Sequence, residues 1–417
     1  GERRRVDELR EQGHRASWDG GATRDTVAKD PKSNRYSGKC ICPTSDKDCR
    51  PTVNPLTLRS LRALALVPAA VATLALAACG SESDGASTGA STASAGVTAT
   101  APAETQKVSF ALDWTPNTNH IGVYVADKLG LYEKAGIELE ILPFSESAPI
   151  TLVGAGKADF GVSTEGSVIL ARSQGQPVKS VFAITQRETS VIVVDGDNTE
   201  ISSPKDLDGK TYGGFGVPAA TATVRAIIRN DGGTGEFEEA TLSTGAYQAL
   251  KSGKIDFTQS IATWESVEVE LAGHPFKAFE YADYGMPRQH TTVIVAADAF
   301  LQENPDLAKR FVSATEEGYR YAIEHPEEAA QILLDAAPNE LGGNPELVKA
   351  SMAKLVEGDY LTTEDGAVGV NVDEYWSGYG DWLVEQELVA GESGKPLAES
   401  PDWTEYYTNE YLGSAAG

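Results

Sequence analysis

The stretch "LVGAGKADFGVST" (residues 152–164) has a near copy in "ALKSGKIDFTQSIAT" (residues 249–263). Each begins with apolar residues at helical spacing, turns at Gly-Lys-x-Asp-Phe and continues with a short run of strand-forming residues. The glycine supplies the backbone freedom that a tight turn requires. A helix–turn–strand unit that occurs twice predicts a chain built from two similar α/β lobes.

Strand-like and helix-like patterns alternate outward from these two units. The segments "KVSFAL" (107–112), "IELEIL" (137–142) and "VKSVFAIT" (178–185) favour strands, and helical periodicity lies between them. Such alternation is typical of an α/β fold with a largely parallel sheet. The segment "TTVIVAADAF" (291–300) is predicted to be a strand that returns to the first lobe. Further helices are predicted over 305–324, 326–336, 344–356, 375–387 and 402–412.

Residues 59–80, "RSLRALALVPAAVATLALAACG", have the features of an export signal. Two arginines precede an uncharged apolar run that is short for a membrane span, and Leu-Ala-Ala-Cys resembles a bacterial lipobox with Cys79 as the lipidated residue. Residues 53–78 are therefore predicted to be a lipoprotein signal peptide, and the small polar residues 79–105 a flexible tether. Residues 1–52 precede the signal, and we expect them to be a mis-assigned upstream segment.

Composition and motifs argue against catalysis and against nucleic acid as a partner. The net charge of −26 offers no basic surface for phosphates. No cysteine follows Cys79, which excludes a thiol nucleophile and a cysteine-ligated metal from the predicted folded part. The histidines of that part are scattered, and it contains neither H-x-x-H, H-E-x-x-H nor G-x-S-x-G. We therefore expect a binding protein with no catalytic residue, metal or cofactor.

Several motifs together resemble the substrate-binding lipoproteins of bacterial ABC importers. They are the lipobox, the tether, D-W-x-P-N-x-x-H-x-G-x-Y-x-A (113–126), "GKADFGVST", "SPKDLDGK" (203–210) and "DYGMP" (283–287). The D-W-x-P-N-x-x-H segment is similar to that of the branch related to thiamine-pyrimidine synthesis proteins, whose importer members bind aminopyrimidine thiamine precursors. The resemblance covers roughly residues 107–412.

This resemblance implies a periplasmic binding protein fold of type II, an α/β fold with two lobes, two crossover strands and a ligand cleft. Lobe 1 would comprise residues 106–194 and 291–417, and lobe 2 residues 195–290. The hinges would lie near 191–195 and 290–295. The resemblance also implies a lipid-anchored position at the outer face of the bacterial cell membrane, with importer permease and ATPase subunits as partners. We expect a monomer.

The polar segment after the first predicted strand is the first candidate for ligand binding. Thr115 as N-cap and Pro116 as the first helical residue would start a helix, but capping does not explain the residues before them. Ligands of α/β lobes lie beyond the carboxyl ends of strands. A carboxylate there could accept from the amine of an aminopyrimidine, and an indole could form a platform for the ring. The predicted contacts are Asp113, Trp114, Asn117 and His120, and the histidine could equally be a buried residue at the helix start.

Two further loops follow predicted strands. In the first, residues 163–165, side-chain oxygens and the amides of the following helix could bind polar groups of a ligand. The side chains could equally serve only as helix caps. In the second, the glycine-rich residues 213–223 allow close backbone approach to a small ligand. The candidates from these two loops are Ser163, Thr164, Glu165, Gly214, Gly216 and Pro218.

The fourth loop, "ATWESVEVEL" (262–271), lies in the predicted second lobe. Related importers carry an aromatic and an acid at this point, so Trp264 and Glu265 would cover the ring from the side opposite Trp114. Tyr284 in "DYGMP" completes the list of candidates.

The identity of the ligand is open at this point. A flat aminopyrimidine fits the carboxylates and aromatics of these loops, and a riboflavin-like heterocycle is the next possibility, because related importers take that class too. A sulfonate or nitrate would require a cationic cradle, for which only Arg187 lies near. A pyrimidine-synthase-like enzyme is a remote alternative, because the eukaryotic synthases carry a cysteine-rich motif that is missing here.

Overall fold

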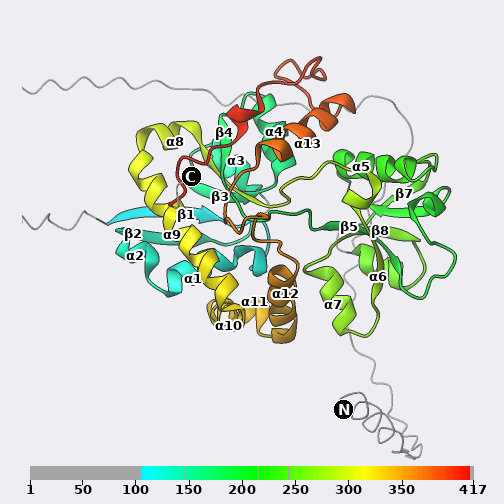
Figure 1. The fold of residues 1–417 in the computed structure, drawn as a ribbon, viewed down its shortest axis with the longest axis horizontal. Coiled ribbons are helices and arrows are strands. Elements are labelled where there is room, and N and C mark those ends of the chain that lie inside the picture. Colours follow the sequence, from blue (N-terminus) through cyan, green and yellow to red (C-terminus); the bar gives the residue numbers. More distant parts are fainter. Residues whose placement is uncertain (1–104, 146, 215, 243–244, 414–417) are drawn as a thin grey trace, which may run out of the picture. The chain divides into compact units, whose positions relative to one another are not determined.

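Two five-stranded sheets organise the chain, one in each lobe (Figure 1). This computed structural model describes residues 105–145, 147–214, 216–242 and 245–413, all of which belong to one unit, residues 93–417. The predicted signal peptide, Cys79 and nearly all of the predicted tether lie outside the described residues.

The first sheet has the strand order β2-β1-β3-β10-β4. Strand β1 (Gln106–Ala111) pairs in parallel with β2 (Ile137–Leu142) and β3 (Phe160–Ser163). Strand β10 (Val293–Ala297) runs antiparallel between β3 and β4 (Val178–Ala183). The strand predicted to return to the first lobe therefore does so, and it lies inside the sheet rather than at its edge.

The second sheet has the order β7-β6-β8-β5-β9. Strand β6 (Thr211–Gly214) pairs in parallel with β7 (Glu238–Thr241) and β8 (Phe257–Ile261). Strand β5 (Ser190–Asp195) runs antiparallel between β8 and β9 (Phe276–Glu280). Both sheets thus consist of three parallel strands, one antiparallel strand and one edge strand in the same order, which confirms that the two lobes are built alike.

The repeated Gly-Lys-x-Asp-Phe segments have the same structural role in each sheet. The carboxylate of Asp159 accepts a 2.8 Å hydrogen bond from the backbone N–H of Ser109 in β1, and that of Asp256 accepts one of 2.8 Å from Thr211 in β6. The glycine of each segment has a positive φ, 64° and 67°, a conformation that glycine adopts without steric cost. The aspartates therefore tie β3 and β8 to the neighbouring strands β1 and β6.

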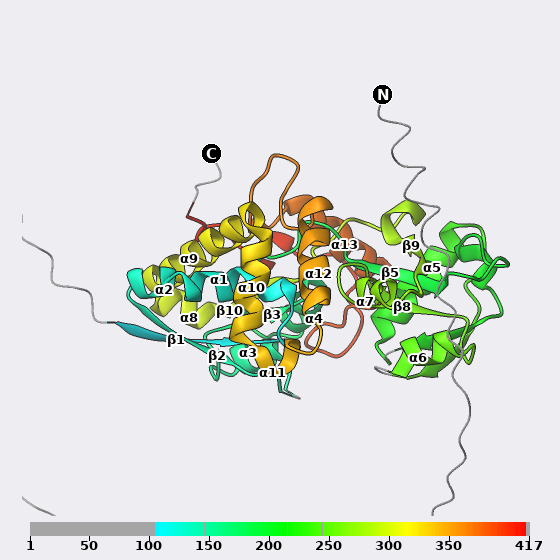
Figure 2. The same cartoon turned by 90° about the horizontal axis from the view of Figure 1, so that it is seen from below.

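Helices cover both faces of the first sheet (Figures 1 and 2). Alternate side chains of β10 enter opposite core clusters, Ile294 on one face and Val293 and Val295 on the other, as the two-residue period of a strand requires. The helices of the Ile294 face are α1 (Ile121–Lys128), α2 (Leu131–Lys134), α8 (Asp298–Glu303), α9 (Pro305–Glu324), α10 (Pro326–Ala336), α11 (Pro338–Leu341) and α12 (Pro345–Glu357). Those of the Val293 face are α3 (Pro149–Gly154), α4 (Glu165–Ser173), α13 (Asp373–Glu385) and the 3₁₀ helix η5 (Trp403–Tyr406).

The second sheet is also covered on both faces. Ile192 and Val194 of β5 enter one core cluster, while Val191 and Val193 enter the other. The first cluster includes residues of α5 (Pro218–Asn230), η2 (Pro204–Leu207) and η4 (Tyr281–Tyr284), and the second includes residues of α6 (Ala246–Lys251). Helix α7 (Glu265–Leu271) follows β8. None of the helices among the described residues is long and apolar enough to cross a membrane.

The first crossover between the sheets precedes its predicted position, and the second overlaps it. Strand β5 belongs wholly to the second sheet, so the first crossover is formed by residues 184–189 and the predicted lobe boundary at 194 falls too late. The second crossover, residues 285–292, ends directly before β10. Both segments are polar and short, and they are the places where the backbone passes from one sheet to the other.

One predicted helix is wrong. Residues 402–412 contain only the short η5, because the chain leaves the helical conformation at Tyr407, which has φ −147° and ψ 172°. Tyr407 forms a bridge with Ser180 of β4, and the N–H of Thr408 donates to the Ser180 carbonyl at 2.9 Å. Pairing with a sheet edge thus overrides the helical pattern of this segment.

Candidate functional site

Loops from both lobes line a cavity of about 550 Å³. They are the loop after β1, the start of α4, both crossovers, the first turn of α5, helix α6, and β8 with the loop that follows it. The described lining residues include two carboxylates and three large aromatics, and neither lysine nor arginine. They are Asp113, Trp114, Asn117, Thr118, Asn119, Thr164, Thr189, Ser190, Ala220, Tyr247, Gln259, Ser260, Ile261, Trp264, Glu265, Thr291 and Thr292.

The loop after β1 is held by Asn117, which caps the 3₁₀ helix η1 (Thr118–His120). The Asn117 side chain accepts from the N–H of Asn119 at 2.9 Å and donates to the Thr115 carbonyl at 3.1 Å. The prediction that Thr115 caps the helix and Pro116 begins it is therefore wrong. Asn117 is the N-cap because its short amide can accept from a helix N–H and also donate to a carbonyl of the loop before it.

His120 is fully buried and does not line the cavity. Its Nδ1 atom accepts from the N–H of Asn117 at 3.3 Å, and its Nε2 atom lies 2.8 Å from Oδ1 of Asp113. Because Nδ1 is an acceptor, the neutral ring carries its proton on Nε2 and donates it to the Asp113 carboxylate. One oxygen of Asp113 is thus fixed from behind, and no hydrogen bond among the described residues ends on the other.

Trp114 lies at the mouth of the cavity with 43 % of its surface exposed. Its ring contacts that of Phe144 at a centroid distance of 5.3 Å and an interplanar angle of 55°. An exposed indole is uncommon in a folded lobe unless a partner covers it. The side chain is therefore free to contact a ring in the cavity.

The second wall comes from β8 and the start of α7. Trp264 is half-buried and packs against the core cluster of the first lobe, although it belongs to the second. Glu265 accepts from the N–H of Ile261 at 3.3 Å, and burial raises the pKa of its carboxyl. Burial, together with the nearby Glu265 charge, also raises the pKa of the Tyr247 hydroxyl. This wall thus presents an aromatic face and a carboxyl that is easily neutralised.

A buried relay connects the two walls. Thr118 and Ser351 of α12 have hydroxyl oxygens 2.6 Å apart, and the Ser351 hydroxyl donates to the Thr263 carbonyl at 2.5 Å. Since Ser351 has one hydroxyl proton, Thr118 is the donor of the first bond. Helices α12 and α7 also contact each other (Figure 1). The loops that carry Trp114 and Trp264 are therefore joined through one serine.

Of the three candidates at the end of β3 and the start of α4, one lines the cavity and two do not. Thr164 lines the cavity and also caps α4, because its hydroxyl accepts from Ser167 N–H at 3.1 Å. Ser163 is buried in the sheet and pairs with Val293. Glu165 is fully buried, and its carboxylate accepts from the His290 N–H at 2.6 Å in the second crossover. Glu165 therefore holds the second crossover from the start of α4 and does not line the cavity.

The remaining candidates surround the site without lining it. Gly214 is buried at the end of β6, where a Cβ would lie 2.8 Å from the Glu239 side chain. Gly216 has a φ of 75°, and Pro218 begins α5, whose next residues include the cavity-lining Ala220. Tyr284 lies in η4, where its ring contacts Phe279. Tyr284 therefore belongs to the second lobe's core margin and not to the cavity.

Sequence reasoning missed several lining residues. Gln259 is a polar residue within the otherwise apolar-polar pattern of β8, and its Oε1 accepts from the Tyr212 hydroxyl at 2.7 Å. Tyr247 follows the helical period of α6 and gave no separate signal. Thr189, Thr291 and Thr292 belong to the crossovers, and their only signal is the run of hydroxyl residues beside a strand.

Comparison with known proteins identifies the family. The family model described as NMT1/THI5 like matches residues 117–329, half of the chain. The chain belongs to the NMT1/THI5-like family. This confirms the resemblance carried by the D-W-x-P-N-x-x-H segment.

Two curated relatives of this NMT1/THI5-like chain differ in function. A formylaminopyrimidine-binding protein of Halalkalibacterium halodurans is 27 % identical over 310 residues, which is 70 % of this chain and 91 % of the relative. A 4-amino-5-hydroxymethyl-2-methylpyrimidine phosphate synthase of Saccharomyces cerevisiae is 25 % identical over 321 residues, 74 % of this chain and 88 % of the relative. The family thus contains both binding proteins and synthases.

Solved structures establish the fold of this NMT1/THI5-like chain. The periplasmic aliphatic sulphonate-binding protein of Escherichia coli has a TM-score of 0.53 at 16 % identity, covering 72 % of this chain and 91 % of its own. The ligand-binding component of an ABC-type import system of Staphylococcus aureus has a TM-score of 0.55 at 15 % identity. The match covers 75 % of this chain and 99 % of the other. The two-lobed α/β chain has the periplasmic binding protein fold.

Proposed function

We propose that this chain is the extracytoplasmic solute-binding lipoprotein of an ABC importer, and that its lobes close over an aminopyrimidine precursor of thiamine. The observation that carries the proposal is the lining of the cavity. Asp113 and Glu265 supply carboxyls, Trp114 and Trp264 supply flat faces, and no lysine or arginine is present among the described lining residues. This combination suits a flat, nitrogen-rich ring that donates hydrogen bonds.

The chemistry of recognition follows from the free oxygen of Asp113. His120 occupies Oδ1, so Oδ2 can accept from the exocyclic amine of an aminopyrimidine. If the ring nitrogen beside the amine is protonated, the carboxylate accepts a second, charge-assisted bond. Stacking against an indole adds about 0.5–1.5 kcal/mol per ring pair beyond the area buried.

The charge of the lining favours an unphosphorylated pyrimidine over a phosphate ester or a sulfonate. An anion beside Asp113 meets like charge and finds no guanidinium or ammonium among the described lining residues. The named relative that binds formylaminopyrimidine supports this ligand class. The product named for the synthase relatives carries a phosphate, so the same argument favours transport over synthesis.

Calorimetry with the purified full-length chain tests the ligand. The probes are formylaminopyrimidine, 4-amino-5-hydroxymethyl-2-methylpyrimidine, its phosphate, riboflavin and ethanesulfonate. We expect one of the two unphosphorylated pyrimidines to bind and to raise the melting temperature with dose, and the phosphate to bind at least about tenfold more weakly. Binding of riboflavin or ethanesulfonate alone would replace the pyrimidine proposal, and conversion of a bound probe into a new product would restore the enzyme alternative.

Two variants test the site itself. Asp113→Asn and Trp114→Ala are each expected to weaken pyrimidine binding by about tenfold or more, the first through a charge-assisted bond and the second through the stacking face. Asp197→Asn removes an exposed carboxylate from a distant loop, and Phe144→Ala removes an aromatic that contacts Trp114 without lining the cavity. These controls should bind normally, and full affinity in Asp113→Asn would contradict the assigned contact.

The lipid anchor and the importer are tested separately. Mass spectrometry of the protein extracted from membranes should find a diacylglycerol group on Cys79, and Cys79→Ser should move the protein to the soluble fraction. Recovery of an unmodified chain with residues 53–78 attached would contradict the anchor without affecting the ligand assignment. Ligand-stimulated ATP hydrolysis by a reconstituted permease and ATPase would identify the partners.

A further inference from the structure

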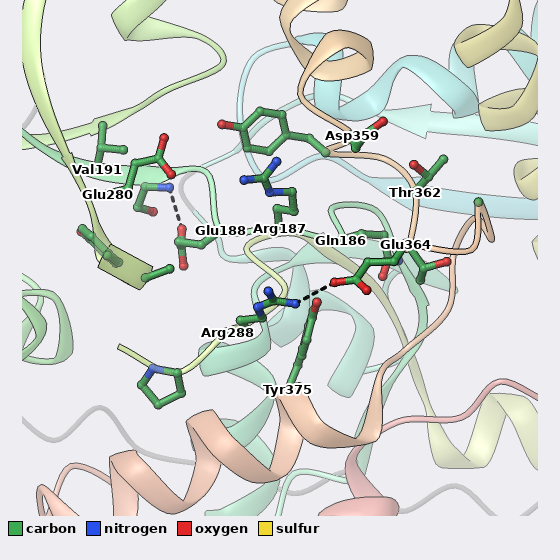
Figure 3. Close-up of a pocket in the computed structure, with 17 residues that line it drawn as sticks. Gln186, Arg187, Glu188, Val191, Glu280, Arg288, Asp359, Thr362, Glu364 and Tyr375 are labelled. Carbon is green, nitrogen blue, oxygen red and sulfur yellow. Dashed lines mark hydrogen bonds and ion pairs between the residues drawn. The ribbon is translucent and has the colours of Figure 1, made fainter. Parts of the chain in front are cut away.

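A second cavity, of about 410 Å³, lies against the crossovers (Figure 3). Residues from both crossovers line it, together with 280–282 from the second lobe and 359–366 from the first. Ser190 at the start of β5 lines this cavity and the candidate site, while the other lining residues of the two differ. We call it the hinge cavity.

The hinge cavity contains two guanidinium groups. Arg187 donates to the Gly358 carbonyl at 2.8 Å, and its guanidinium carbon lies 5.4 Å from the centre of the Tyr360 ring. Arg288 forms an ion pair with Glu364 at 3.2 Å, which the dashed line in Figure 3 marks. The Arg288 side chain is two-thirds exposed. A guanidinium has five N–H donors, so each arginine keeps donors beyond these contacts.

The same cavity contains carboxylates that lack a cationic partner. Glu188, Glu280 and Asp359 line it, and none of them forms an ion pair within the described part of the chain. The Ser190 N–H at 2.6 Å and the Thr291 hydroxyl at 2.9 Å donate to Oε1 of Glu188. Figure 3 shows Glu188 and Glu280 together on one side of Arg187.

Gln186 lines the hinge cavity, but its side-chain oxygen is not open to it. Its side chain lines the cavity at 2 % exposure, and its Nε2 donates to the Ala183 and Val370 carbonyls at 3.0 Å each. Its Oε1 is buried without any hydrogen-bond partner among the described residues.

We propose that the hinge cavity is a second binding site for a small zwitterion that carries a carboxylate and a protonated amine, such as a free amino acid. The arginines would bind the carboxylate, and Glu188 and Glu280 would accept from the ammonium. A simple anion would meet the carboxylates, and a simple cation would meet the guanidiniums, so the mixed lining selects a ligand with both charges. The cavity volume is within the range of small-molecule sites.

A thermal-shift screen of the full-length chain with each standard L-amino acid tests this proposal. The amino acid with the largest effect is then compared by calorimetry with its N-acetyl derivative, which lacks the positive charge, and its amide, which lacks the negative charge. We expect the free amino acid to bind and each derivative to bind at least about tenfold more weakly, since each loses one charge-assisted contact. No shift with any amino acid, or binding of either derivative as tightly as the free amino acid, would overturn the proposal.

Variants place the binding in the hinge cavity. Arg288→Gln should weaken amino-acid binding at least about tenfold, and because this side chain is mostly exposed its loss leaves the packing intact. Arg229→Gln removes an exposed arginine of α5 and serves as the matched control. Asp113→Asn and Trp114→Ala should bind the amino acid normally. If these two abolish binding while Arg288→Gln does not, the amino acid occupies the first cavity and the proposal fails, whatever the outcome for pyrimidines.

Discussion

His120 donates from Nε2 to Oδ1 of Asp113 across 2.8 Å, from a position that no solvent reaches. The imidazole is itself oriented by the Asn117 N–H, which occupies its other nitrogen. The carboxylate at the cavity wall thus has one fixed oxygen and one available oxygen. A side chain that is outside the cavity therefore determines how a side chain inside it can bind.

Replacing His120 should weaken ligand binding because it changes the orientation of Asp113, and not because His120 itself contacts the ligand. His120→Phe keeps an aromatic ring but removes the donor, so Asp113 loses its orientation, and we expect pyrimidine affinity to fall about tenfold. His120→Gln retains a donor and should recover part of the loss. The measurement is calorimetry, with the exposed His274→Phe as control. Equal affinity in His120→Phe and the wild-type chain would show that the contact does not position Asp113.

The serine between the two walls is a second point of control. Ser351→Ala leaves the Thr118 hydroxyl and the Thr263 carbonyl without their buried partner, which costs about 1–3 kcal/mol in the free energy of unfolding. Urea denaturation measures this loss, and Ser400→Ala on the exposed surface is the control. A change in the free energy of unfolding below about 0.5 kcal/mol, the range of ordinary surface substitutions, would show that Ser351 does not join the two loops.

His290 in the second crossover makes the free energy of unfolding depend on pH. Burial lowers the pKa of His290 from 6.5 to about 4, and the neutral ring donates to the Thr185 carbonyl and accepts from the Val372 N–H. Between pH 6.5 and 4 the unfolded chain binds the proton and the folded chain does not, so stability falls as pH drops through this window. The contribution is on the order of 3 kcal/mol. Unfolding by urea from pH 4.5 to 7.5 should show a smaller dependence in His290→Gln.

Glu165, which accepts from the His290 N–H, titrates with the opposite sign. Burial raises the pKa of its carboxyl well above 4.5, so ionisation is disfavoured in the folded chain and stability falls as pH rises above that value. Glu165→Gln should therefore gain stability at neutral pH relative to the wild type. A variant that loses stability equally at pH 4.5 and 7.5 would contradict this assignment.

Much of the fold could be predicted from the sequence because it rests on local periodicity. The repeated Gly-Lys-x-Asp-Phe unit, the strand–helix alternation and the helices Pro305–Glu324 and Pro326–Ala336 appear where the patterns indicate. One failure occurs where a distant contact decides the local structure, because Tyr407 pairs with Ser180 of β4. The other is local, since Asn117 caps the helix in place of Thr115 and its amide also donates to the Thr115 carbonyl.

The position of Trp114 at the cavity could be predicted, because this side chain has no capping role in its loop. Glu165 could not be assigned, because a carboxyl at the start of a helix has the same sequence signature whether it faces a ligand or a buried crossover amide. Gln259 and Tyr247 are lining residues whose patterns fit an ordinary strand and helix. Such residues enter the cavity only through the packing of one lobe against the other, which no local pattern contains.

The two repeated aspartates should behave as a pair. Asp159→Asn and Asp256→Asn each weaken the bond from a backbone N–H of the neighbouring strand, so each should lower the free energy of unfolding by about 1–2 kcal/mol. Because the sites lie in different sheets, their effects should add in the double variant. Urea denaturation measures the free energy of unfolding of each variant. If only one of the two single variants lost stability, the two turns would not have equivalent roles.

The position of β10 has a consequence for how the chain acquires its shape during synthesis. The second sheet is encoded without interruption from Ser190 to Glu280, so it can close as soon as that segment emerges. The first sheet lacks the strand between β3 and β4 until Val293–Ala297 has been made. In chain order, every strand of the second sheet is therefore present before the first sheet can be completed, although the first sheet begins earlier in the chain.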